Sequence, residues 1–480
     1  MPKIVFLGTD LVLYVIALLL LAYVWRVASN ANLRATWEKV ARDPVALSAA
    51  IVLMVFALVT MVDSFHFRRA LPTAAGAAAD APSSYAPKTE SLLDLVLSRQ
   101  ISTREVGYSQ PLAYRAFNKE SMIVGGVTGR GFPRLIFGGA QLSDPDSQWA
   151  ADITTRSLIG LTAGLVVAAL ASLLTAFVVR PAHDGVRGAL RDIAADRTHL
   201  PLRAALITFA IICALIGPLV ALMGNYHVFG TDRTGNDVFY QSLKSVRTAF
   251  VIGTLATVAT LPFAVVLGVL AGYLKGWVDE VIQYLYTTLS SVPNVLLIAA
   301  CVLMVQVYLD QHSEMFETGL ERSDVKIFLL CVILGVTGWA TLCRLIRGET
   351  LKLRELDFVQ AATAFGVSPA RIMARHIVPN VMHLVLITTV LSFSDLILYE
   401  AVLTYVGVGV DPSMNSFGGM INGARSEMSR DPIVWWSFAA AFAFMVTLVL
   451  AANLFADGVR DAFDPRARSF RPRLRRAAMS

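Results

Sequence analysis

Charged residues and cysteines are scarce in this 480-residue sequence. Asp, Glu, Lys and Arg together make up 16% of the chain, whereas hydrophobic residues reach 56%; an average soluble protein has about 25% charged residues. The four cysteines are too few for a disulfide framework. No Gly-Lys dipeptide occurs, so the usual phosphate-binding P-loop is absent, and the seven histidines lack metal-ligand spacing. This composition argues against a soluble enzyme, a disordered chain or a fibre, and indicates a membrane protein.

Long apolar segments occupy most of the chain. A helix needs about 20 mainly apolar residues to cross a bilayer. About nine segments approach this length, at residues 4–25, 45–62, 157–179, 204–223, 250–273, 281–309, 327–342, 381–398 and 433–455. Asp10 interrupts the first, and Pro293 is expected to kink the sixth. We expect an all-α polytopic membrane protein with about nine transmembrane helices and no cleavable signal peptide.

Lys and Arg are concentrated in alternate connections between these segments. The basic connections are 26–44, 180–203, 343–380 and 456–480. Because basic connections stay on the cytoplasmic side, the pattern predicts an external N-terminus and a cytoplasmic C-terminus. The net charge of +6 is then a topology signal rather than a sign of nucleic-acid binding, and the basic run at 466–476 is expected to contact anionic membrane lipid.

Residues 66–155 interrupt the apolar pattern and predict a small mixed α/β insert on the extracytoplasmic side. The stretch 70–87 is rich in Ala, Ser and Pro and is typical of a linker. Apolar residues recur at helical spacing over 91–99, whereas 122–142 combines β-forming residues with glycines and predicts short strands and turns. The role and detailed fold of this insert stay open from the sequence.

The basic connection at 343–380 carries the most specific pattern. Residues 358–365 predict a short amphipathic helix that Gly366 ends as a C-cap. Ser368 and Pro369 then predict the start of a second helix, as N-cap and first-turn proline. The small residues of this segment would let the surface of another protein approach closely.

This pattern resembles the EAA motif of ABC-importer permeases, in which Glu-Ala-Ala-x-x-x-Gly is followed by Ile-x-Leu-Pro. The matching positions here are Gln360, Ala361, Ala362, Gly366, Ile377 and Pro379. Gln360 replaces the usual Glu, which removes a charge but keeps a group able to form hydrogen bonds. The ending at 376–380 looks like the form found in the dipeptide and oligopeptide subfamily.

Four further stretches resemble the C-type subunit of that type I subfamily, in the same order. They are 230–238, 271–280, 399–410 and 457–466. The resemblance covers about residues 204–466, and 37–65 is similar to the family's N-terminal segment, displaced upstream. Outside that match, the apolar pattern predicts a two-helix membrane region at 1–65, the insert at 66–155 and a third helix with a cytoplasmic linker at 156–203. A six-helix type I permease core would follow at 204–466, and a basic tail at 467–480.

The resemblance also implies a function and its partners. The chain would be a non-catalytic subunit of an ATP-driven peptide importer in the bacterial inner membrane, forming half of the translocation pathway. It would bind no cofactor itself, because ATP and Mg would sit on two partner ATPase domains, separate or fused. A second permease and an extracytoplasmic binding protein would complete the complex. The alternatives are an importer of nickel or another small solute, and a membrane signalling or assembly protein that acts through the insert.

Three groups of residues are candidates for this function. The motif positions Gln360 to Pro379 are expected to couple to the ATPase. Thr231, Asp232 and Asp237 lie in an external loop where a binding protein would dock. Asp395 and Glu400 are acidic residues of the eighth segment, and such residues usually face a cavity or a partner rather than lipid. Asp395 could attract the cationic end of a peptide, but we favour a structural hydrogen bond to a neighbouring helix or to the partner subunit. For Glu400 we favour a gating or structural role.

Overall fold

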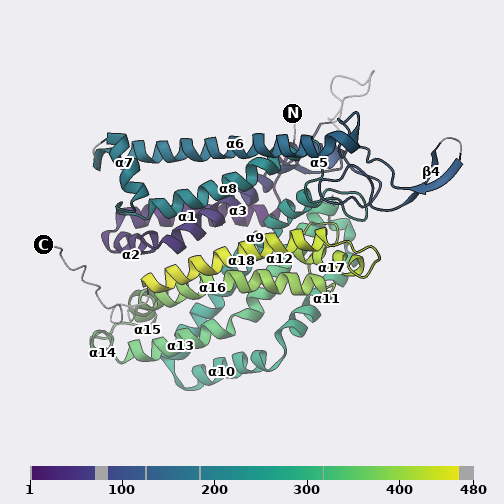
Figure 1. Cartoon of the computed structure of the whole chain (residues 1–480). Helices are drawn as coiled ribbons and strands as arrows, with labels where there is room; N and C mark the ends of the chain where they lie inside the picture. Colours follow the sequence, from purple (N-terminus) through teal and green to yellow (C-terminus); the bar gives the residue numbers. More distant parts are fainter. Residues whose placement is uncertain (1–2, 71–84, 125–126, 183–184, 317, 464–480) are drawn as a thin grey trace, which may run out of the picture.

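The computed structural model describes residues 3–70, 85–124, 127–182, 185–316 and 318–463. Within these residues the chain forms a bundle of long helices with two small antiparallel sheets (Figure 1). The predicted basic tail at 467–480 and most of the predicted linker at 70–87 lie outside the described residues.

Among the described residues, eight single helices are long and apolar enough to cross a membrane. They are α1 (Gly8–Ser29), α3 (Pro44–Asp63), α6 (Pro145–Val179), α8 (Leu202–Leu222), α9 (Val238–Leu274), α11 (Asn294–Gln311), α16 (Val378–Tyr405), whose continuous helical segment starts at Pro369, and α18 (Trp436–Phe463). The helices α12 (Gly319–Gly338) and α13 (Ala340–Arg354) form a further span bent by 42°. The prediction of an all-α polytopic protein with about nine spans is confirmed.

Shorter elements connect these spans. The short helices are α2 (Ala31–Ala41), α4 (Leu92–Val96), α5 (Ser98–Ser102), α7 (Gly185–Ala194), α10 (Gly276–Ser291), α14 (Asp357–Ala364), α15 (Pro369–Ile372) and α17 (Phe417–Glu427). The strands are β1 (Lys3–Val5), β2 (His66–Arg68), β3 (Glu90–Ser91), β4 (Glu120–Val124) and β5 (Val127–Gly131). β2 lies between β1 and β3, with Ile4 opposite Phe67, and β4 and β5 form a separate two-stranded sheet.

The insert has the mixed structure that its sequence predicts. Ser91 and Asp94 form a capping box at the start of α4, in which each side chain accepts from the backbone N–H of the other residue. The glycine-rich stretch contains the β4–β5 hairpin, which projects away from the bundle (Figure 1).

The sixth predicted span is broken into two helices rather than kinked. α10 ends at Ser291 and α11 begins at Asn294, and Val292 between them is extended (φ −89°, ψ 135°). Proline disfavours the helical conformation in the residue before it, so Pro293 accounts for the break.

The two ends of the bundle carry different connecting segments. The end that carries the insert, α17 and the start of α1 is called the insert end, and the end that carries α2, α7 and α14 is called the loop end (Figure 1). Because β1 pairs with β2, the start of the chain is attached to the insert end. The two groups of connections that the basic-residue pattern separates therefore lie at opposite ends of the molecule.

Helices α6 and α8 form a close pair at the side of the bundle. Their backbones cross through glycines, because a Cβ on Gly164 would lie 2.2 Å from the Cys213 carbonyl oxygen and one on Gly217 would lie 2.2 Å from the Gly160 carbonyl oxygen. Small residues allow this kind of contact between membrane helices. α8 packs chiefly on α6 and also on α3, whereas α3 packs on α9 and α18.

The crossing of α6 and α8 predicts that Gly164→Ala lowers stability. The added methyl group overlaps backbone atoms that cannot rotate away, so we expect a loss of about 1–3 kcal/mol, measured by thermal unfolding in detergent. Gly348→Ala is the matched control, since nothing lies within 4 Å of its Cβ position and alanine favours helices. Equal effects of the two substitutions would contradict the proposed crossing.

Candidate functional site

The α14–α15 connection at the loop end is built as its sequence predicts. α14 ends at Ala364, and Gly366 follows with a φ of +74°. The Gly366 N–H donates to the Thr363 carbonyl (3.0 Å), and the Val367 N–H donates to the Ala362 carbonyl (3.1 Å). Glycine adopts this left-handed conformation without the steric penalty of a side chain. The turn therefore holds α14 and α15 in a fixed relative orientation.

The inner face of this connection is anchored in the bundle. Val359, Ile372 and Ile377 are almost fully buried and belong to one apolar cluster with Ile346 and Val381. Ile377, which the motif comparison places among the coupling residues, therefore anchors the loop from within.

The outer face of the same connection is exposed. Gln360, Ala361, Gly366 and Pro379 are exposed and Ala362 is half-buried, so the predicted motif residues other than Ile377 reach the surface. The Phe365 side chain is 86% exposed. An aromatic ring in that position is the kind of group that anchors a protein interface.

A π-helical turn joins the loop to α16. It spans Met373–Ile377 and passes directly into α16, whose second residue is Pro379. Turns of this type are rare and frequently mark functional sites. The motif ending at 376–380 thus forms the junction between the exposed loop and a membrane helix.

The base of the loop is fixed to α9 and α10. Arg347 of α13 makes two charge-assisted hydrogen bonds with Asp279 of α10, of 2.6 and 2.7 Å, a geometry stronger than a single contact. A Cβ on Gly272 of α9 would lie 2.6 Å from the Thr350 side chain, so α9 and α13 are in close contact. The base of the loop therefore joins three helices, α9, α10 and α13.

The external loop at 230–238 lies under the insert. Thr231 is fully buried, donates to the Gly107 carbonyl (2.7 Å) and accepts from the Ser109 N–H (2.7 Å). Asp237 is buried and caps α9. Of the three predicted docking residues the structure leaves only Asp232 partly exposed, so Thr231 and Asp237 hold the insert to the bundle.

Glu105 and His227 strengthen this attachment. The Glu105 carboxylate accepts three backbone N–H groups, of 136, 137 and 138, at 2.8–2.9 Å. His227 Nδ1 lies 2.8 Å from Asp237, and its Nε2 lies 3.6 Å from Glu105. Burial opposes both charges, but these contacts lower the pKa of Glu105 to about 2 and raise that of His227 to about 9.

The two acidic residues of α16 lie in different environments. Asp395 is exposed and makes no hydrogen bond or ion pair with the residues that the structure describes. Glu400 is fully buried and accepts from Thr404 (2.8 Å), which also accepts from the Val410 N–H (3.0 Å). Glu400 thus supports the turn after α16, whereas the structural hydrogen bond favoured for Asp395 is not found within the described chain.

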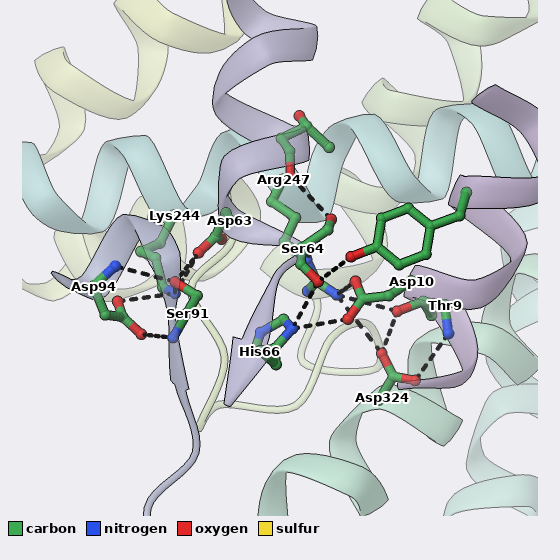
Figure 2. Close-up of polar contacts among 12 residues, drawn as sticks. Thr9, Asp10, Asp63, Ser64, His66, Ser91, Asp94, Lys244, Arg247 and Asp324 are labelled. Atoms are coloured by element: carbon green, nitrogen blue, oxygen red, sulfur yellow. Dashed lines mark hydrogen bonds and ion pairs between the residues drawn. The ribbon is translucent and has the colours of Figure 1, made fainter. Parts of the chain in front are cut away.

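A buried group of charges joins the N-terminal helices to the later ones (Figure 2). The group, here called the Arg247 cluster, consists of Thr9, Asp10, His66, Arg247 and Asp324. Arg247 of α9 donates to Asp10 of α1 and lies 3.9 Å from Asp324 of α12. His66 donates to Asp10 (2.8 Å), and the Thr9 N–H donates to Asp324 (3.0 Å). All five residues are buried.

A second group of charges, the Lys244 cluster, ties the insert to the same helix (Figure 2). Lys244 of α9 lies 2.6 Å from Asp63 at the end of α3 and 3.0 Å from Asp94 of α4. Ser91 donates to Asp63 (2.6 Å). The insert, α3 and α9 therefore meet at one point.

The sequence analysis missed both clusters and Phe365. For the Arg247 cluster one signal was visible, because Asp10 interrupts an apolar segment and such a residue needs a partner. For Phe365 the signal was an aromatic residue directly before the cap glycine in a connection expected to be exposed.

Comparisons with known proteins match roughly half of the chain. The family described as "Binding-protein-dependent transport system inner membrane component" matches residues 264–469. The chain is 32% identical over 252 residues to the oligopeptide transport system permease protein OppC of Mycobacterium tuberculosis, which covers 52% of this chain and 80% of that protein. It is 30% identical over 243 residues to the dipeptide transport system permease protein DppC of Alkalihalophilus pseudofirmus. That match covers 51% of this chain and 73% of that protein. A solved structure of the inward-facing methionine ABC transporter MetNI matches with 16% identity and a TM-score of 0.34, covering 46% of this chain and 93% of that chain.

The Arg247 cluster predicts a large loss of stability for Arg247→Met. Removing one partner leaves buried carboxylates without a counter-charge, which costs about 3–5 kcal/mol, and thermal unfolding in detergent measures this loss. The triple variant with Asp10→Asn and Asp324→Asn should recover most of the loss. Lys352→Met is the control, since the Lys352–Glu349 pair is at the surface and should change stability by less than about 1 kcal/mol. Unchanged stability of Arg247→Met would contradict the cluster.

The His227 contacts predict a pH dependence of the insert's attachment. Because the pKa of His227 is raised from 6.5 to about 9 in the folded chain, its stabilisation is complete below pH 6.5 and is lost as the pH rises through 9. The melting temperature of wild type should exceed that of His227→Gln at pH 6, and the difference should shrink by pH 10. A difference that stays constant over this range would argue against a charged His227.

Proposed function

The chain belongs to the family of binding-protein-dependent transport system inner membrane components, and on that premise we propose that it is the permease subunit of an ATP-driven importer of di- or oligopeptides. This proposal rests on the exposed loop, whose base joins three helices. Its surface carries Gln360, Ala361, Gly366 and Phe365. The names of the relatives, oligopeptide and dipeptide transport permeases, support the substrate class.

In this proposal the chain forms half of a translocation pathway in the inner membrane and binds no nucleotide itself. ATP and Mg²⁺ are bound by two partner ATPase domains, and a second permease supplies the other half of the pathway. Asp395, exposed on α16, would face this pathway or the second permease. An extracytoplasmic binding protein delivers the peptide at the insert end, where Asp232 reaches the surface.

The coupling mechanism follows from the two faces of the loop. Phe365 inserts into a groove of the ATPase, and the small residues Ala361 and Gly366 let that surface approach the backbone. When the ATPases close, the buried side chains of Val359 and Ile372 carry the movement into the bundle. The Arg347–Asp279 pair moves α10 together with α13. One local displacement would thereby reorient the helices that line the pathway.

The proposed coupling sets the orientation of the chain. If the loop end meets a cytoplasmic ATPase, α2, α7 and the C-terminus are cytoplasmic, and the N-terminus and the insert are external. The excess of Lys and Arg in the connections of the loop end supports this orientation.

The packing of the helices suggests how the six-helix permease core is composed. We assign α3 to this core rather than α8, because α3 packs on α9 and α18, whereas α8 packs chiefly on α6. The core would then comprise α3, α9, α10–α11, α12–α13, α16 and α18. The α6–α8 pair and the insert would be additions between the first and second core helices.

The proposal predicts that Phe365→Ala weakens association with the ATPase. Loss of a central aromatic anchor typically costs about 2–4 kcal/mol of binding free energy, so co-purification of the ATPase with the chain should fall at least tenfold. Phe177→Ala is the matched control, since Phe177 is also exposed but lies on α6. An ATPase that co-purifies equally with both variants would contradict the assigned docking face, and a chain that never binds an ATPase would contradict the function.

A further inference from the structure

A cavity of about 420 Å³ opens at the insert end, on the side of α17. Its walls come from the start of α9, the connection between α16 and α17, α17 itself and the start of α18. Arg233, Asn422 and Ser426 form its rim and are exposed, so the cavity is open to the surface. Its volume falls within the range of about 300–1,000 Å³ that small-molecule sites occupy.

Two polar side chains in the wall of this cavity are buried and incompletely bonded. Glu427 is 7% exposed; its Oε1 accepts from the Tyr108 hydroxyl (3.0 Å), but its Oε2 has no hydrogen-bond partner among the described residues. Ser437 is 5% exposed, and its hydroxyl also has no partner in the part of the chain that is described. Buried polar groups are normally hydrogen-bonded, and an unpaired one is destabilising. Both side chains therefore have free bonding capacity toward a ligand.

The charges around the cavity favour a cationic ligand. Asp232 lines the cavity, and its carboxylate is bonded to uncharged groups of Thr234, Asn236 and Gln241. Burial raises the pKa of Glu427 and the negative charge of Asp232 raises it further, against the opposing effects of Tyr108, Arg430 and Arg233. A ligand cation placed beside the unpaired Oε2 of Glu427 would further relieve this unfavourable burial of a carboxylate.

We propose that this cavity binds the ammonium end of a peptide, with Glu427 Oε2 accepting from the ammonium group and Ser437 bonding to the adjacent peptide unit. The inference rests on the proposed function and deepens it, since it names a substrate subsite in the permease itself. A free amino terminus is the one cationic group that all unmodified peptides share, so such a site recognises peptides regardless of their side chains.

The site also gives the insert a role. Tyr108 belongs to the insert and shares a buried apolar cluster with Trp436, against which Phe117 packs, and its hydroxyl donates to one oxygen of Glu427. Tyr108 thereby acts as a positioning residue that leaves the other oxygen for the ligand.

The test measures peptide binding to the purified complex of this chain with its permease and ATPase partners, in lipid nanodiscs and without the binding protein. Equilibrium dialysis compares radiolabelled tri-alanine with N-acetyl-tri-alanine, which lacks the ammonium charge. Wild type should bind tri-alanine at least tenfold more tightly. Glu427→Gln should remove this preference, and it keeps the acceptor for Tyr108. Glu120→Gln, an exposed substitution in the β4–β5 hairpin, should leave the preference intact.

Ser437→Ala is the second variant and removes only one hydroxyl. It should weaken binding of both peptides about threefold without changing the preference for a free amino terminus. Equal binding of the two peptides to wild type, or a full preference in Glu427→Gln, overturns the proposed site.

The coupling loop lies at the opposite end of the bundle, so ATPase association should stay at the wild-type level in Glu427→Gln. Lost peptide preference with retained ATPase association supports the subsite. If ATPase association is lost as well, Glu427→Gln has disturbed the whole chain. The threefold weaker peptide binding expected of Ser437→Ala then becomes the test of the subsite. A failure of the wild-type chain to bind any ATPase tells against the proposed function rather than against this cavity.

Discussion

The Arg247 guanidinium lies inside an apolar bundle, where the carboxylates of Asp10 and Asp324 pair with it and the nearby charge of Asp63 helps to balance it. A buried charge in such surroundings is tolerable only with well-placed partners, so three helices must meet at this point. One of them, α1, precedes the insert, whereas α9 and α12 follow it. The Lys244 cluster repeats this arrangement one turn of α9 earlier and adds the insert. The N-terminal helices, the insert and the later helices therefore form one connected body at the insert end.

In the proposed function the two ends of the bundle have different roles. The insert end is held by buried ion pairs and by the insert itself, which covers Thr231 and Asp237. The loop end instead exposes Phe365 and the small residues of the motif on a connection fixed to α9, α10 and α16. A peptide would be received at the insert end, and the energy of ATP hydrolysis would enter at the loop end. The helices between them are the physical link.

Local patterns made much of this structure predictable. The spans follow from apolar length, and the α14–α15 connection follows from Gly366 and Pro369, whose effects act within a few residues; Ser368 occupies the predicted N-cap position, but its side chain makes no capping hydrogen bond. The Arg247 cluster could not be predicted, because Asp10 and Asp324 are far from Arg247 in the sequence and no spacing relates them. Nor could the sequence show that the insert folds back over Thr231, since that depends on tertiary contacts. The sequence predicted a kink at Pro293, whereas the structure has a break between two helices. The extent of the break depends on how α10 packs on α9 and α13.

In the proposed function this chain forms one half of the membrane pathway of an ATP-driven peptide importer. Uptake of radiolabelled tri-alanine by proteoliposomes that contain the second permease, the ATPases and the binding protein tests it most directly. The account predicts ATP-dependent accumulation of the peptide when this chain is included and none when it is omitted. Equal accumulation without the chain, or no accumulation of any peptide with the complete set, would contradict it.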